Sequence, residues 1–163
     1  MVIVLIGPMG CGKTTIGELL AERIGADFDD ADDFHPPANV AKMRSGTPLN
    51  DEDRAGWLAI LAKRIRDRQG RGRDLVLACS ALKQKYREAL GINQLDVVSV
   101  YLKGSRKILE ERLASRSHQY MNDDLLTSQL EAMEEPADGV VVDIGAPPGE
   151  LVDKIIDNLD LNG

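Results

Sequence analysis

The sequence predicts an α/β fold in which helices cover both faces of a parallel sheet. Short apolar runs alternate along the chain with longer segments of helical period, as in repeated strand–helix–strand units. The first apolar run, Val2–Ile6, is continuous and mostly β-branched, which is typical of a strand buried on both faces. A chain of 163 residues suits one domain, so we expect residues 1–163 to form a single domain without disulfides or structural metal.

The first unit is a strand, a loop and a helix. Val2–Ile6 is the buried strand, Lys13–Ile24 has helical period, and Gly25 is the stop signal. One face of this helix carries four apolar residues: Ile16, Leu19, Leu20 and Ile24.

Later elements follow the same alternation after a short second strand. A long helix begins at an N-cap of Asn50 or Asp51 and carries apolar residues at helical spacing: Trp57, Leu58, Leu61 and Ile65. Further strands are expected at residues 75–79, 97–102 and 140–144, and further helices at 105–114, 125–133 and 150–159. Because the strands are parallel, functional side chains are expected in the loops at their carboxyl ends.

Composition excludes several classes of function. The formal charge of −7 disfavours nucleic acid as a partner, so an anionic substrate needs a local basic cluster. The densest basic stretch, residues 63–73, is interpreted as a solvated helix surface. The longest apolar run is too short for a membrane span or a signal peptide, so we expect a cytoplasmic protein that begins at Met1. Cys11 and Cys79 are expected to be reduced thiols.

A phosphate-binding loop joins the first strand to the first helix. Gly7-Pro8-Met9-Gly10-Cys11-Gly12-Lys13-Thr14 fits the pattern G-x-x-x-x-G-K-[ST], whose backbone N–H groups surround nucleotide phosphates. Lys13 is expected to bridge the β- and γ-phosphates of ATP, and the Thr14 hydroxyl to hold Mg²⁺. The expected nucleotide contacts are Gly7, Met9, Gly10, Cys11, Gly12, Lys13, Thr14 and Thr15.

The acceptor side of the site is expected in three later segments. Four carboxylates, Asp29, Asp30, Asp32 and Asp33, follow the second strand and would repel one another unless a cation or a substrate hydroxyl uses them. A solvated acidic turn is the alternative. Residues 42–54 place cations and hydroxyls around a turn, which by itself could be only a capping box. The strand at residues 75–79 leads to Lys83, beside the phosphate loop.

These residues resemble the gluconate kinases (gluconokinases) of the P-loop small-molecule kinase group over nearly the whole chain. Shikimate kinases share the phosphate loop and D-x-D, but their glycine triplet after the third strand is replaced here by Cys79-Ser80-Ala81-Leu82. Besides the phosphate loop, the resemblance rests on Asp30-Ala31-Asp32, His35-Pro36, Lys42-Met43, Ser45-Gly46, Pro48-Leu49-Asn50-Asp51, Asp53-Arg54, Trp57-Leu58, Cys79-Ser80-Ala81-Leu82-Lys83, Tyr86-Arg87, Tyr101-Leu102-Lys103-Gly104, Ser128-Gln129, Glu135-Pro136 and Val142-Asp143.

The resemblance implies a three-layer P-loop kinase fold, with strand order 2-3-1-4-5 and a mobile lid near residues 112–125. It implies transfer from ATP·Mg²⁺ to the 6-hydroxyl of D-gluconate, and a homodimer. Asp30 would order Mg²⁺ with Thr14, and Asp32 would orient the acceptor hydroxyl and take its proton. The expected substrate contacts are Asp32, His35, Arg54, Lys83, Arg87 and Gln129, with a place beside the γ-phosphate as the alternative for Lys83.

The lid entry is expected to supply arginines. Arg112 and Arg116 would lie over the phosphates and exclude water, although their spacing alone is equally typical of an ordinary helix surface. Arg116 joins Lys13, Asp32 and Lys83 in the expected catalytic set. The family's lid histidine is shifted by one residue at His118, so His118 is not assigned to the site. Residues 145–148 are expected near the adenine.

Two alternative functions stay open at this point. One is a kinase for another acceptor, such as a related sugar acid, a shikimate-like acid, a nucleoside monophosphate or adenylylsulfate. The other is a nucleotide-binding switch or scaffold, which is disfavoured because the sequence contains no Asn-Lys-x-Asp guanine-reading motif.

Overall fold

The computed structural model describes residues 1–94, 96–115 and 123–161. Five parallel strands form one sheet in the order β2-β3-β1-β4-β5. The strands are β1 (Val2–Ile6), β2 (Asp27–Asp30), β3 (Leu75–Ala78), β4 (Val97–Lys103) and β5 (Val140–Asp143). The predicted fold class and strand order are therefore confirmed.

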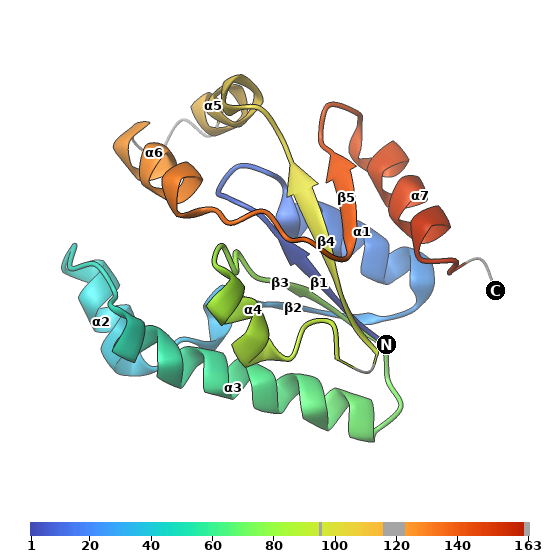
Figure 1. Ribbon diagram of the computed structural model, residues 1–163, viewed down its shortest axis with the longest axis horizontal. Coiled ribbons are helices and arrows are strands. Elements are labelled where there is room, and N and C mark those ends of the chain that lie inside the picture. The colour runs from blue at the N-terminus through green and yellow to red at the C-terminus, as the bar shows by residue number, and fades with distance from the viewer. Residues whose placement is uncertain (95, 116–122, 162–163) are drawn as a thin grey trace.

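Helices cover both faces of the sheet (Figure 1). On one face lie α1 (Lys13–Ile24) and α7 (Pro148–Asn158), packed on Ile3 and Leu5 of β1. On the other lie α3 (Asp51–Gly70) and α4 (Gln84–Leu90), packed on Val2, Val4 and Ile6. Alternate side chains of β1 thus enter two different cores, as the continuous apolar run predicts.

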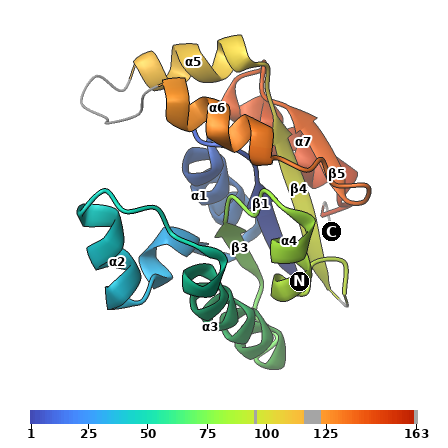
Figure 2. The ribbon, with the colours of Figure 1, turned by 60° about the vertical axis from the view of Figure 1, so that its left-hand side comes forward.

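The remaining helices lie toward the carboxyl ends of the strands. α5 (Arg106–Ala114) and α6 (Asp123–Ala132) lie beyond the end of β4, while the 3₁₀ turn η1 (Ala31–Phe34) and α2 (Pro37–Arg44) extend from the end of β2 (Figure 2). The phosphate loop lies between these two groups of elements. The sheet therefore presents its carboxyl edge to helices contributed by both halves of the chain.

Two predicted helix boundaries are confirmed by their cap geometry. Gly25 ends α1 with φ of 70°, the left-handed conformation that glycine adopts without strain. Asn50 begins α3 through a capping box: its side chain accepts from the Asp53 N–H at 2.8 Å, and Asp53 accepts from the Asn50 N–H at 3.0 Å. The capping box is therefore present, and residues 37–44 also form a helix, α2, that the sequence did not predict.

The acidic and basic runs are paired differently from the prediction. Asp29 and Asp30 belong to β2 rather than following it, and the Asp29 carboxylate accepts from Arg64 Nε at 2.8 Å. Arg68, which is buried, pairs with Asp27. The stretch at 63–73 is therefore not a wholly solvated face, because two of its arginines join α3 to β2. Asp29 already has its cation and is not available to the site.

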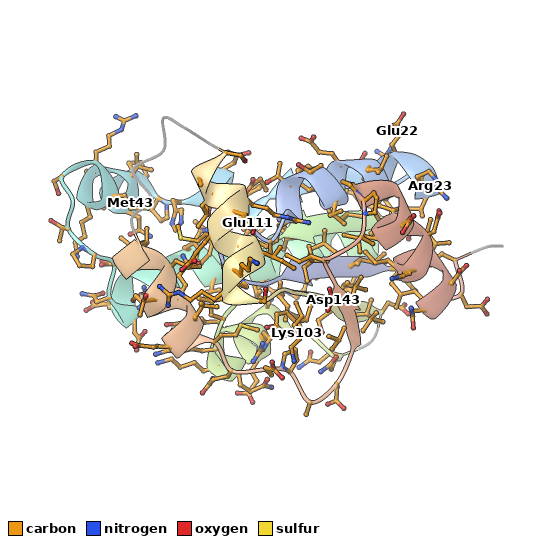
Figure 3. The ribbon with its side chains drawn as sticks, turned by 90° about the horizontal axis from the view of Figure 1, so that it is seen from above. Glu22, Arg23, Met43, Lys103, Glu111 and Asp143 are labelled. Atoms are coloured by element: carbon orange, nitrogen blue, oxygen red, sulfur yellow. The ribbon has the colours of Figure 1, made fainter. Side chains whose placement is uncertain are left out.

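Ion pairs also connect elements elsewhere on the surface. Glu22 and Arg23 lie near the outer end of α1, and Arg23 contacts Asp153 of α7 at 2.8 Å (Figure 3). Lys103 and Asp143 are register partners at the ends of β4 and β5. No helix in the described part of the chain has the length and apolar character needed to cross a membrane.

Candidate active site

The phosphate loop depends on glycine where the backbone passes close to other atoms. Gly7, directly after β1, has φ of 149°, and a Cβ there would lie 2.9 Å from Cys11 Sγ and 3.0 Å from the Leu102 carbonyl oxygen. Gly12 is the N-cap of α1 with φ of 94°. The loop therefore turns tightly from the strand into the amino end of α1, where the helix dipole favours a phosphate.

Lys13 lies folded back over this loop. Its Nζ donates to the Gly7 carbonyl at 2.9 Å and to the Pro8 carbonyl at 3.2 Å, and lies 3.8 Å from Cys11 Sγ. A neutral carbonyl is a weaker partner for an ammonium group than a phosphate oxygen. A bound nucleotide would therefore take over a cation that the loop already holds in place.

Thr14 and Asp30 place two oxygen ligands together at the start of α1 and the end of β2. The Thr14 hydroxyl donates to Asp30 Oδ2 at 3.2 Å, while Asp30 Oδ1 accepts from the Asp32 N–H at 3.0 Å. Mg²⁺ prefers such hard oxygen ligands and keeps several waters. Both predicted metal ligands are thus brought together, and their donor set fits magnesium.

A cavity of about 270 Å³ joins the phosphate loop to residues 30–33, which we call the acidic turn. Asp32 reaches solvent at this cavity, but desolvation by surrounding protein atoms, reinforced by the Asp30 carboxylate, raises its pKa. Burial raises the pKa of the Cys79 thiol to about 12, so Cys79 lines the cavity as a protonated, unreactive thiol. The cavity is lined by Met9, Gly10, Gly12, Lys13, Thr14, Asp30, Asp32, Ala78, Cys79, Ser80 and Gln129.

Trp57 of α3 supports the acidic turn from below. Its Nε1 donates to the Ala31 carbonyl at 2.7 Å in a buried hydrogen bond, and Ala31 separates Asp30 from Asp32. The ring of His35 stacks on Trp57 with a centroid distance of 4.4 Å and an angle of 14° between the planes. One aromatic side chain thus holds both the Asp30–Asp32 backbone and the His35 ring.

We expect Trp57→Phe to reduce the stability of the fold and the activity together. The substitution leaves the buried Ala31 carbonyl without its donor, which costs about 1–3 kcal/mol, and for a domain of this size each kcal/mol lowers Tm by about 2–4 °C. Thermal unfolding measures the effect. Ile60→Ala, an exposed change on the same helix, is the control, and an unchanged Tm in Trp57→Phe would contradict this account of the turn.

Arg54, an expected substrate contact, is held at the first turn of α3. Its Nη1 donates to the Leu49 carbonyl at 2.9 Å, and its Nη2 lies 3.2 Å from Asp51 Oδ1. Asp51 also accepts from Lys85 and from the Tyr86 hydroxyl, and these three partners hold the pKa of Asp51 well below its usual range. This network joins the first turns of α3 and α4, which the sequence did not predict.

Lys83 and Arg87, two further expected contacts, belong to the α4 segment. Lys83 is the residue before α4, just past the end of β3. Arg87 is buried, and its Nη2 donates to the Glu134 carbonyl at 2.5 Å. Its Nε and Nη1 have no hydrogen-bond partner among the described residues. Of the expected substrate contacts, the described lining of the 270 Å³ cavity includes Asp32 and Gln129 but not His35, Arg54, Lys83 or Arg87.

The lid side contacts the phosphate loop through two predicted residues. Arg112 of α5 donates to the Cys11 carbonyl at 3.2 Å and to the Ile144 carbonyl at 2.7 Å. Gln129 of α6 accepts from the Met9 N–H at 2.7 Å, so it contacts the loop itself. Arg116 and His118 lie outside the described residues. A second cavity, of about 200 Å³, is lined by Gly10, Gly12, Thr15, Ile16, Arg112, Ser115, Pro148 and Leu151.

The sequence analysis did not predict two residues that support the site. Asn39 is a buried side chain of α2 that contacts His35, and the only sequence signal for it is the spacing of four residues from His35. Glu134 follows α6 in the chain and accepts from the Gln84 N–H at 2.7 Å, so it caps α4 across a gap of 50 residues. Contacts at such separation have no local signal.

Comparisons with known proteins agree with this geometry. The AAA domain family model matches residues 2–138. A probable gluconokinase of Dictyostelium discoideum is 39% identical over 98% of this chain and 86% of its own length, and a gluconokinase of Gluconobacter oxydans (strain 621H) is 44% identical over 83% and 76%. A crystal structure of a gluconokinase from Sinorhizobium meliloti 1021 superposes with a TM-score of 0.86 at 38% identity, covering 98% of this chain and 91% of that one.

Proposed function

The chain belongs to the gluconokinase family, and on this premise we propose that it transfers the γ-phosphoryl group of ATP to the 6-hydroxyl of D-gluconate. The products are 6-phospho-D-gluconate and ADP. It is an ATP-dependent carbohydrate kinase, a phosphotransferase with an alcohol acceptor. One observation carries the proposal: a single cavity is lined by Lys13, Thr14 and Asp30 on its nucleotide side and by Asp32 on its acceptor side.

Each residue has a role that its position supports. Lys13 moves from the loop carbonyls to the β- and γ-phosphates, where its charge stabilises the transferring group. Asp32 orients the acceptor hydroxyl and takes its proton, a task that its raised pKa suits. Thr14 and Asp30 would hold Mg²⁺, which neutralises phosphate charge when bound.

The substrate contacts are proposed around this centre. His35 and Gln129 flank the acidic turn and the loop. Arg54, Lys83 and Arg87 are proposed for the carboxylate and polyol, with Lys83 beside the γ-phosphate as the alternative. Nε and Nη1 of Arg87, which have no hydrogen-bond partner among the described residues, support this role, because an acceptor oxygen that reached them would satisfy them. Arg116 is proposed to cover the phosphates from a lid near residues 112–125.

The nucleotide base is proposed to lie in the 200 Å³ cavity. Arg112 of α5 and Pro148 of α7 both line it, and Thr15 and Gly12 connect it to the phosphate loop. A homodimer and a cytoplasmic location are also proposed: the homodimer rests on the family resemblance, and the location rests on the shortness of the longest apolar run. Light scattering of the purified protein tests the first.

The activity test pairs two acceptors that share a primary alcohol. We expect purified protein with ATP, Mg²⁺ and D-gluconate to form ADP and 6-phosphogluconate, detected by ³¹P NMR. D-Glucose, which has the 6-hydroxyl but no carboxylate, is the matched control and should be a poor acceptor, because the arginine and lysine contacts lose their anion. Failure to form 6-phosphogluconate, or faster turnover of shikimate or adenylylsulfate, would contradict the proposal.

A further inference from the structure

A buried amide lies between the His35 ring and the start of α3. Asn39 of α2 is 4% exposed. Its Nδ2 lies 3.0 Å from the Asp53 carbonyl oxygen and 3.3 Å from His35 Nδ1. The same nitrogen therefore contacts two protein groups, and what each group can donate or accept determines where the protons are.

The Asp53 carbonyl fixes the orientation of the amide. A backbone carbonyl oxygen only accepts, so the group of Asn39 that faces it must be the NH₂ and not the side-chain oxygen. An amide NH₂ carries two protons and only donates. The partner ring nitrogen, His35 Nδ1, must then be the acceptor. A neutral imidazole that accepts at one nitrogen carries its proton on the other.

The neighbouring groups hold this arrangement in place. Stacking on Trp57 sets the plane of the His35 ring. The Asp53 carboxylate pairs with Lys42 at 2.8 Å and accepts from the Asn50 N–H, so the start of α3 is held firmly. Burial lowers the pKa of His35, and the charge of Asp32 opposes that shift. Among the described residues, the charge that acts on the ring is that of Asp32 on its own turn, while Lys42 on α2 and the Asp53 carboxylate on α3 pair with each other.

We propose that Asn39 is a positioning residue that holds His35 as the neutral tautomer protonated at Nε2, and that this N–H donates to an oxygen of the acceptor substrate. The two ring nitrogens point in different directions, so the Nε2–H points away from Asn39. The half concerning the substrate rests on the proposed function. The half concerning the tautomer rests only on the contacts of Asn39.

The first experiment measures the tautomer without any substrate. Long-range ¹H–¹⁵N spectra separate a protonated ring nitrogen from an accepting one, and the chain has only two histidines, so His118→Gln assigns the signals. We expect wild-type His35 to show a protonated Nε2 and a bare Nδ1, with a titration midpoint below 6.5. A protonated Nδ1 in the wild-type protein would overturn the proposal.

Asn39→Asp changes the partner of His35 Nδ1 from a donor to an acceptor. A carboxylate only accepts, and an opposite charge this near favours the protonated ring. We therefore expect Nδ1 to become protonated and the midpoint for His35 to rise above its wild-type value. Asn158→Asp, the same change at an exposed position of α7, is the matched control and should leave the His35 spectrum unchanged. A variant Asn39→Asp that folds and leaves the His35 spectrum unchanged would overturn the proposal.

Asn39→Leu keeps the test decisive if the buried carboxylate prevents folding. Leucine is close to asparagine in size and removes the donor without adding an acceptor, so we expect both His35 tautomers and a rise of about threefold to tenfold in KM for gluconate, the worth of one neutral hydrogen bond. KM for ATP should not change. A single wild-type tautomer in Asn39→Leu overturns the first half. An unchanged KM for gluconate overturns the statement that the Nε2–H donates to the substrate. If the wild-type protein does not turn over gluconate at all, that statement fails because the proposed function fails, and the statement about the tautomer is unaffected.

Discussion

Replacing Asp32 with asparagine is expected to lower kcat by about 10²–10⁴-fold, the usual contribution of a positioned general base. Asparagine keeps the size of the side chain and its ability to accept a hydrogen bond from the acceptor hydroxyl, but it does not take the proton. KM for ATP should change little, because the nucleotide contacts come from the loop and not from the acidic turn. Steady-state kinetics with gluconate and ATP measure both parameters.

The same substitution is expected to stabilise the folded protein at neutral pH. Desolvation and the Asp30 charge raise the folded-state pKa of Asp32 above its ordinary value of 3.8, so the folded state binds this proton more tightly than the unfolded state does. The ionised carboxylate therefore reduces the free energy of unfolding as pH rises through the folded-state pKa. Asparagine removes that penalty. The gain should be small, because the side chain reaches solvent, and it should vanish below about pH 3.8.

Asp33→Asn is the matched control for Asp32→Asn. Asp33 is the next residue of the same turn, is exposed, and does not line the described cavity. We expect it to retain activity. An Asp32→Asn enzyme with near wild-type kcat would remove Asp32 from the role of base, and one that is less stable at pH 7 would contradict the raised pKa of Asp32. A loss of kcat with a gain in Tm is the signature of a functional residue that is held at a cost in stability.

Local patterns predicted the parts of the fold that are locally determined. β1 is a continuous apolar run, and the beginning of α3 and the end of α1 carry a capping box and a glycine stop, so each signal lies within a few residues of the element it defines. The helices α2 and α4 were missed because each is short and buries few apolar residues. Their helical form depends on tertiary contacts, such as the Glu134 cap on α4.

The same distinction separates the predictable and unpredictable parts of the site. The phosphate loop is eight consecutive residues with a fixed pattern, and the structure brings its predicted metal ligand Thr14 to Asp30 across 16 residues. The acidic run was harder to interpret, since its four carboxylates have different surroundings in the fold. Asp29 pairs with Arg64 on α3, 35 residues away, while Asp30 and Asp32 face the cavity. Only the packing of α3 against β2 decides which carboxylates remain for chemistry.

Lys13→Ala is expected to lower kcat by about 10²–10³-fold, the loss typical when one preorganised group that stabilises transition-state charge is removed. The fold should tolerate the change, because Lys13 lines the cavity, where water can replace Nζ as the donor to the Gly7 and Pro8 carbonyls. Thermal unfolding should therefore show a nearly unchanged Tm, and the defect should appear in single-turnover phosphoryl transfer.

Lys13→Arg keeps the charge but not the compact ammonium, so we expect partial activity. Lys154→Ala, on the exposed face of α7, is the control. Full activity in Lys13→Ala would mean that the charge gathered over the transferring phosphoryl group comes from elsewhere, and the phosphate loop would then only bind the nucleotide.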